Sequence, residues 1–146
     1  MSKTYRPSVF VVVYRKEEKK IKYLLLKRKL HWTGWEFPKG GIKEKENLLQ
    51  SVRREVLEET GQFPVLINKF NEKGEYKYPT LLPDRQNYMG QEYILFAAEI
   101  KSKKIKLDKK EHSNFKWLSF KEAEKLLTYS NQKKCLRIVN NYLNRI

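Results

Sequence analysis

Three closely spaced glutamates carry the strongest chemical signal in the chain. Glu58 and Glu59 lie three and four positions after Glu55, and this spacing places side chains on one face of an α-helix. Three carboxylates so close together repel one another unless a cation lies among them. Magnesium or manganese fits, because hard divalent cations bind carboxylate oxygens. The spacing therefore predicts a metal site on a helix.

The chain around these glutamates is strongly basic. Thirty-two Lys and Arg stand against seventeen Asp and Glu, which gives a formal net charge of +15. A bound cation within a basic protein favours a substrate rich in phosphate, such as a nucleotide or an RNA. The alternative is that lysine only keeps the surface soluble, since the lysines are spread along the chain. Both explanations stay open at this stage.

Length and composition restrict the class of protein. With 146 residues, 40% of them hydrophobic, the chain is expected to form one domain, residues 1–146, with a proper core. Cys135 is the only cysteine, so we expect neither an internal disulfide nor a cysteine-ligated zinc, and we place it in the core. The sequence shows no charged-then-apolar pattern typical of a signal peptide and no apolar run of about 18 residues, so we expect neither a signal peptide nor a membrane span. We expect a cytoplasmic protein without a membrane partner, either a monomer or a homodimer.

Apolar patterns predict the elements that must position the glutamates. Leu48, Val52 and Val56 form a buried helical stripe, and Gly61 is a suitable C-terminal cap. Ser119 and Glu122 form a candidate capping box for a second helix. The predicted strands are 7–14, 21–26, 35–37, 65–78 (irregular), 93–100 and 115–118, and the other helices are 119–127 and 131–143. Strands and helices interleave, which predicts an α/β domain.

The residues next to the glutamate helix favour a site over a merely charged helix face. A turn is predicted at 38–41, where Gly40 and Gly41 allow the backbone to approach a ligand closely. Glu46 precedes the helix and is placed to tie the loop to it. Arg54 can bind a carboxylate with two hydrogen bonds and fix its orientation.

Taken together, these positions resemble the Nudix hydrolase signature. The matching run, over residues 40–62, is Gly40, five residues, Glu46, seven residues, Arg54-Glu55-Val56, one residue, Glu58-Glu59, one residue, Gly61. Gln62 departs from the pattern, because the family usually has an aliphatic residue there. We expect Phe63 to supply that packing instead.

The resemblance implies a fold, a cofactor and a reaction. The fold is an α/β/α sandwich with a mixed β-sheet between helices. Magnesium or manganese would be held by Glu55, Glu58 and Glu59, helped by a backbone carbonyl near Lys39 or Gly40. The reaction is cleavage of a nucleoside diphosphate linked to another group, in which a metal-bound water attacks phosphorus. A carboxylate must accept the proton of that water. Glu59 and Glu111 are both candidates for this role.

Segments outside the signature are similar to diadenosine tetraphosphate hydrolases and bacterial RNA pyrophosphohydrolases. They are residues 35–41, residues 76–79 and Gly90-Gln91. Glu111 lies six residues before Trp117, where RNA-decapping relatives have a metal-reaching glutamate; a surface loop acid is the alternative. The principal predicted substrate is a dinucleoside polyphosphate. The alternatives are the 5′-triphosphate end of RNA and a non-catalytic nucleotide-binding or RNA-binding module.

Seven residues are predicted to bind the substrate. Lys39 and Arg28 are candidates to contact phosphate, while Tyr78 and Tyr88 are candidates to stack on a base, with packing as the alternative. The complete predicted set is Lys39, Gly40, Gly41, Arg28, Tyr78, Tyr88 and Gln91. His31 and His112 lack metal-ligand spacing, and we expect both on the surface.

Overall fold

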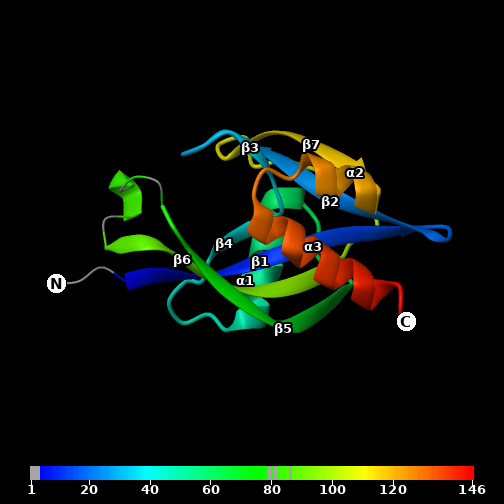
Figure 1. Cartoon of the computed structure of the whole chain (residues 1–146), viewed down its shortest axis with the longest axis horizontal. Helices are drawn as coiled ribbons and strands as arrows, with labels where there is room; N and C mark the ends of the chain where they lie inside the picture. Colours follow the sequence, from blue (N-terminus) through cyan, green and yellow to red (C-terminus); the bar gives the residue numbers. More distant parts are fainter. Residues whose placement is uncertain (1–3, 79, 81, 86) are drawn as a thin grey trace.

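A mixed β-sheet forms the centre of the fold (Figure 1). The structure is a computed structural model, and it describes residues 4–78, 80, 82–85 and 87–146. Within these residues the sheet has seven strands, in the order β3-β2-β1-β6-β5, with β4 paired to β1 and β7 paired to β2. The strands are β1 Thr4–Glu17, β2 Lys20–Arg28, β3 Gly34–Glu36, β4 Lys39–Gly41, β5 Leu66–Lys77, β6 Tyr88–Glu99 and β7 His112–Leu118. Pro79, the last residue of the predicted segment 76–79, lies outside the described residues.

Helices cover both faces of this sheet, which confirms the predicted sandwich. Helix α1 (Leu48–Thr60) packs on one face, and α2 (Phe120–Leu126) and α3 (Ser130–Leu143) pack on the other. Strand β1 serves both cores, because alternate side chains of a strand point to opposite faces. Val9, Val11 and Val13 join the α1 core, whereas Phe10, Val12 and Tyr14 join the α3 core. A short 3-10 helix, η1, spans Pro83–Arg85.

The ends of α1 are defined by local chemistry. Asn47 caps the N-terminus in a reciprocal capping box with Gln50. Gly61 closes the C-terminus with φ 79, a left-handed conformation that glycine adopts without strain. The predicted capping box of Ser119 and Glu122 at the start of α2 is also confirmed.

Two local predictions are wrong. The predicted turn at 38–41 is mostly strand β4, which pairs antiparallel with β1 and aligns Val9 with Gly40. Phe63 does not replace the missing aliphatic residue, because it is 69% exposed. Gln62 instead donates to the backbone carbonyls of Ser102 and Lys104 at 2.8 and 2.7 Å, so hydrogen bonds anchor this end of α1.

The region predicted as an irregular strand is β5, whose pairing with β6 shifts register between Lys69 and Lys73. In the part of the chain that the structure describes, no helix has the length and apolarity needed to cross a membrane.

Candidate active site

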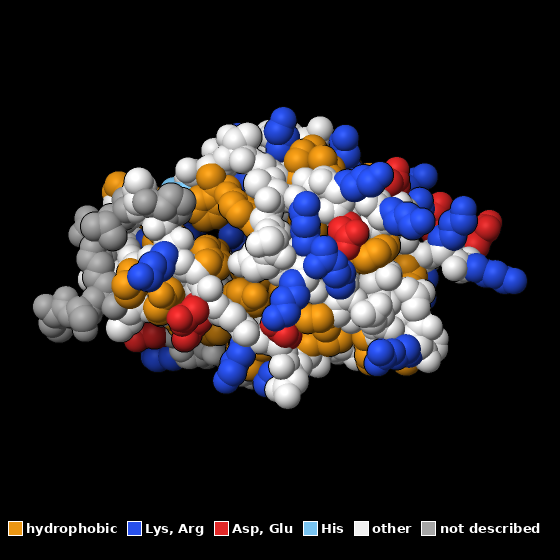
Figure 2. Space-filling model, viewed as in Figure 1, with side chains coloured by type: hydrophobic (Ala, Val, Ile, Leu, Met, Phe, Trp, Pro, Cys, Tyr) orange, Lys and Arg blue, Asp and Glu red, His pale blue; other side chains and the backbone are white. Residues whose placement is uncertain are grey.

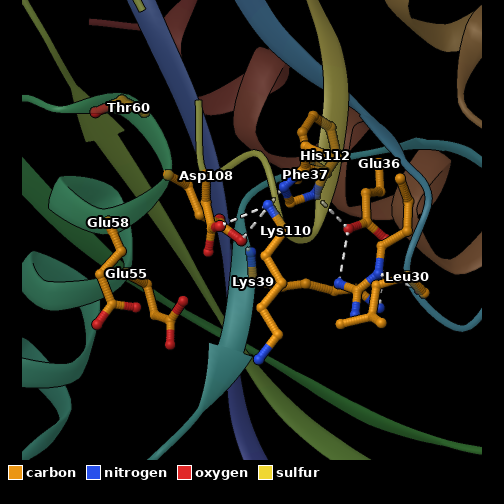
Figure 3. A network of polar contacts seen from close by, with 12 residues as sticks. Leu30, Glu36, Phe37, Lys39, Glu55, Glu58, Thr60, Asp108, Lys110 and His112 are labelled. Atoms are coloured by element: carbon orange, nitrogen blue, oxygen red, sulfur yellow. Dashed lines mark hydrogen bonds and ion pairs between the residues drawn. The ribbon is translucent and has the colours of Figure 1, made fainter. Parts of the chain in front are cut away.

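The three signature glutamates differ in their exposure to solvent. Glu55 is 6% exposed and Glu59 is 1% exposed, whereas the side chain of Glu58 is 46% exposed. Helix α1 buries Glu55 and Glu59 because they lie one turn apart on the side that faces β4. Figure 3 shows Glu55 and Glu58 projecting from this helix. The predicted carboxylate cluster is therefore two buried acids with one exposed acid beside them.

Arg54 connects this cluster to the loop before α1. Its Nε and Nη2 donate to the two oxygens of Glu46 at 2.9 and 2.6 Å, which is the bidentate geometry expected of arginine and carboxylate. Its Nη1 donates to Glu55 at 2.6 Å and to Glu58 at 3.4 Å. Nη2 also donates to the carbonyl of Gly41 at 2.8 Å. Arg54 thus fixes the loop, the helix and two of the carboxylates in one arrangement.

Strand β4 lies directly against the buried acids. The backbone N–H of Lys39 donates to Oε2 of Glu59 at 3.2 Å. A Cβ atom on Gly40 would overlap the carboxylate of Glu55, and one on Gly41 would overlap the guanidinium of Arg6. Both glycines are required by this close approach of the protein's own side chains, and their predicted approach to a ligand stays a prediction.

Glu111 approaches the cluster from the segment before β7. Glu59, Glu111 and His112 each offer a ligand atom, and these atoms lie within 4.8 Å of one another. Oε1 of Glu59 is buried and has no hydrogen-bond partner among the described residues. A buried acceptor without a partner is costly, so this oxygen is poised for a cation or a proton.

A second buried charge network supports the acids, and the sequence did not predict it. Glu36 is 1% exposed, and it lies 3.1 Å from Nη1 of Arg28, 2.9 Å from Nε2 of His112 and 3.6 Å from Nζ of Lys39. Figure 3 shows Glu36 and His112 pointing toward one another from β3 and β7. Nδ1 of His112 lies 4.0 Å from Oε1 of Glu59, which links the network to the site.

The expectation that both histidines lie on the surface is therefore wrong. His112 is completely buried, because it fills the space between Glu36 and Glu59. His31 is partly buried, with 11% of its side chain exposed, and its Nε2 lies 3.1 Å from Asp84. One sequence signal pointed to the buried network: Glu36 is an acid between Trp35 and Phe37, and a buried acid needs a cationic partner.

Burial and neighbouring charges shift the pKa values of these acids in opposite directions. Burial raises the pKa of Glu55 to about 7, against the lowering effect of Arg54. Burial, together with Glu55 and Glu111, raises the pKa of Glu59 well above its ordinary value. Burial alone would raise the pKa of Glu36 as well, but Lys39, His112 and Arg28 lower it to about 2. Glu36 therefore stays ionised. Too little positive charge lies around Glu55 and Glu59 to keep their pKa values low.

The predicted phosphate-binding side chains are already engaged. Arg28 is 3% exposed and donates to Glu36 and to the carbonyl of Leu30. Lys39 is 5% exposed, and its Nζ lies 3.0 Å from the hydroxyl of Tyr76. Burial would lower the pKa of Lys39, but Glu36 and Tyr76 leave it raised. Both cations line the active-site cavity while they neutralise Glu36.

The two predicted stacking tyrosines lie in different surroundings. Tyr78 is 7% exposed, and its hydroxyl donates to Gln91, which also accepts from Arg85. Stacking of Tyr78 on a base would require its ring to leave this packing. Tyr88 is half-buried and lines a cavity beside Glu111. The substrate roles of these residues stay predictions.

Three adjoining cavities surround the cluster. The central one, about 190 Å³, is lined by Glu55, Glu58 and Glu111 and by basic residues. On one side it shares Lys39 with an aromatic cavity of about 350 Å³, lined by Trp32, Tyr76 and Tyr129. Figure 2 shows hydrophobic side chains around a hollow beside the start of α3.

The third cavity, about 400 Å³, is polar. It shares Arg6, Arg85 and Glu111 with the central cavity. The central cavity therefore borders an aromatic and a polar cavity through different residues.

Similarity to known proteins extends over most of the chain. The family model described as NUDIX domain matches residues 4–137. A protein named RNA pyrophosphohydrolase from Sulfurovum sp. is 29% identical, over 97% of this chain and 94% of that protein. One of the same name from Stenotrophomonas maltophilia is 28% identical, and the match covers 80% of this chain but only 60% of that protein.

Solved structures show the same fold. An Ap4A hydrolase from C. elegans, in a binary complex, superposes with a TM-score of 0.79 at 23% identity, covering 97% of this chain and 99% of that one. The dihydroneopterin triphosphate pyrophosphohydrolase of E. coli superposes with a TM-score of 0.76 at 23% identity, covering 92% and 95%.

Proposed function

The chain belongs to the NUDIX domain family, and from this membership we propose that it is a magnesium-dependent pyrophosphohydrolase that cleaves dinucleoside polyphosphates of the diadenosine tetraphosphate type. The observation that carries the proposal is the buried carboxylate of Glu59. Its Oε1 has no partner among the described residues and lies in a group with Glu111. We also propose that residues 1–146 act as a single domain.

The residues fit a hard divalent cation. Glu55, Glu58, Glu59 and Glu111 offer only carboxylate oxygens, the donors that magnesium and manganese prefer. The raised pKa values of Glu55 and Glu59 indicate a deficit of positive charge, which a cation would remove. His112 offers Nδ1 to the same space, because its Nε2 is held by Glu36 at 2.9 Å and Nδ1 has no partner among the described residues.

Each residue then has a separate task in hydrolysis. The bound cation supplies charge neutralisation at the phosphates and an acidified water. Glu59 or Glu111 accepts the proton of that water, since both lie beside the same small space. Arg54 holds Glu55 in place through the 2.6 Å bond, and β4 holds Glu59 through the N–H of Lys39. We propose that Arg6, Lys43 and Arg85, which line the same cavity, bind the phosphates.

The aromatic cavity beside the acids supports a substrate that carries a base. The aromatic cavity, with Trp32, Tyr76 and Tyr129, has flat apolar walls on which a base can stack. The ammonium of Lys39 lies 4.6 Å from the centre of the Trp32 ring and marks the passage from this cavity toward the acids. If a base binds in the aromatic cavity, the phosphates attached to it therefore lie next to the carboxylates.

The second candidate substrate is the 5′-triphosphate end of RNA. Two observations favour it: the relatives named RNA pyrophosphohydrolase and the net charge of +15. Phosphates outside the active site would then add affinity that depends on salt. A non-catalytic binding module is disfavoured, because such a module has no need to retain four carboxylates together with Arg54.

The proposal is tested by a kinetic panel at fixed salt and magnesium. Purified protein is incubated with diadenosine tetraphosphate, with nucleoside triphosphates and with triphosphorylated RNA, and the products are separated. We expect asymmetric cleavage of diadenosine tetraphosphate, with kcat/KM well above that for nucleoside triphosphates. Binding of all three without cleavage would favour the non-catalytic module and contradict the proposal.

A further inference from the structure

A lysine-rich segment, residues 101–110, connects β6 to β7 and ends at the candidate active site. It contains six lysines and one aspartate. All six lysines are exposed, and none has an ion pair with a described residue. By contrast, Figure 2 shows Lys and Arg side chains interspersed with acidic ones on the face that carries α3. The segment is thus a concentration of unneutralised positive charge.

This segment is held in a fixed conformation although it has no regular secondary structure. Gln62 donates to the carbonyls of Ser102 and Lys104 at 2.8 and 2.7 Å. Ile105 and Leu107 turn inward and pack against the core under α1. Because the apolar residues pack inward and all six lysines are exposed, the segment presents a row of lysines to solvent. A fixed row of charges binds an anionic chain with less loss of entropy than a flexible one.

The row leads into the polar cavity beside the acids. Asp108 and Lys110, at the end of the segment, line this cavity together with Arg85 and Tyr88. The cavity shares Glu111 with the catalytic cluster. The charged row, the polar cavity and the acids therefore follow one another without a gap in the lining residues.

We propose that residues 101–110 bind the sugar-phosphate chain of a single-stranded RNA whose 5′-triphosphate end lies at the acids, and that the first nucleotides of this chain enter the polar cavity. Single-stranded nucleic acids are typically bound by a positive groove with an aromatic side chain for stacking, and Tyr88 offers that ring. A dinucleoside polyphosphate ends within the cavities and has no phosphates to place on the row. The proposal rests on the proposed hydrolase activity.

The test compares two triple variants that remove the same charge. The first carries Lys103→Gln, Lys104→Gln and Lys109→Gln, which keep the backbone hydrogen bonds. The matched control carries Lys121→Gln, Lys125→Gln and Arg145→Gln, three exposed residues on or next to the helices of the opposite face. For each protein, kcat/KM is measured on a triphosphorylated RNA of about a dozen nucleotides and on diadenosine tetraphosphate.

We expect the first variant alone to lower the ratio of kcat/KM for the RNA to kcat/KM for diadenosine tetraphosphate. Three lost phosphate contacts reduce the salt slope for a single strand by about 2, so between 50 and 200 mM salt the wild type should lose about 20-fold more activity on RNA than this variant. Equal ratios and equal salt slopes for both variants would overturn the proposal. If the wild type cleaves diadenosine tetraphosphate but not the RNA, this proposal is overturned; if it cleaves neither, the hydrolase activity itself is contradicted.

Discussion

Replacement of Glu55 by glutamine should stabilise the metal-free protein at high pH while it removes activity. The pKa of Glu55 is raised from 4.5 to about 7 because the carboxyl group is buried. A folded-state pKa above the unfolded value means that stability is greatest below the unfolded pKa and falls as pH rises toward the folded pKa. The wild type should therefore lose stability between pH 5 and pH 8. Glu55→Gln should not show this loss, because the glutamine does not ionise.

The expected size follows from the shift. Each pKa unit corresponds to about 1.4 kcal/mol, so ionisation of Glu55 should lower the free energy of unfolding by about 2.5 kcal/mol between pH 5 and pH 8. The glutamine retains an oxygen that can accept from Arg54, so the hydrogen bond, 2.6 Å long in the wild type, is retained. The assay is denaturant unfolding in chelator at both pH values, for wild type and variant.

Magnesium should reverse the order of stability of wild type and Glu55→Gln. A cation that binds only the folded state stabilises it, and the wild type should gain more than Glu55→Gln. Turnover of the variant should fall about 1,000-fold, since a metal ion contributes several kcal/mol to transition-state stabilisation. A variant that is destabilised equally at both pH values and retains near-normal turnover would refute the reasoning.

Three further predictions concern single residues. Glu111→Gln should reduce turnover and weaken manganese binding, measured by calorimetry; unchanged values for both would make Glu111 a bystander. Gly40→Ala should displace the carboxylate of Glu55 and lower kcat, with circular dichroism as the check on folding; wild-type kcat would show that the close approach has no role. Glu36→Gln should cost about 3–5 kcal/mol of unfolding free energy, because it leaves Arg28 and Lys39 buried without their anion; a loss below about 1 kcal/mol in denaturant unfolding would speak against a buried ion pair.

The signature helix was predictable because its information is local. The spacing of Glu55, Glu58 and Glu59 is a property of one helix, and the periodic apolar positions and Gly61 define where that helix lies and ends. The strands other than β4 were predicted for the same reason, from apolar runs. The sandwich followed once the resemblance to a known family was recognised, since the interleaved strands and helices alone indicated only an α/β domain.

The parts that were missed depend on contacts between distant segments. His112 and Glu36 are 76 positions apart, and only the pairing of β7 and β3 with β2 brings them together. Gly40 lies in strand β4 because β1 offers an edge there, which no local pattern indicates. Phe63 was expected to be buried from its hydrophobicity, but Gln62 anchors the helix end by hydrogen bonds instead.

The most direct test of the central claim is the magnesium dependence of diadenosine tetraphosphate hydrolysis in wild type and in Glu59→Gln. The initial rate is measured from chelator alone up to saturating magnesium, with folding of the variant confirmed beforehand. The buried, unpartnered oxygen of Glu59 predicts a rate that rises from near zero to saturation in the wild type and stays close to zero in the variant. Hydrolysis in chelator at the full rate, or a normal magnesium response in Glu59→Gln, would contradict the account.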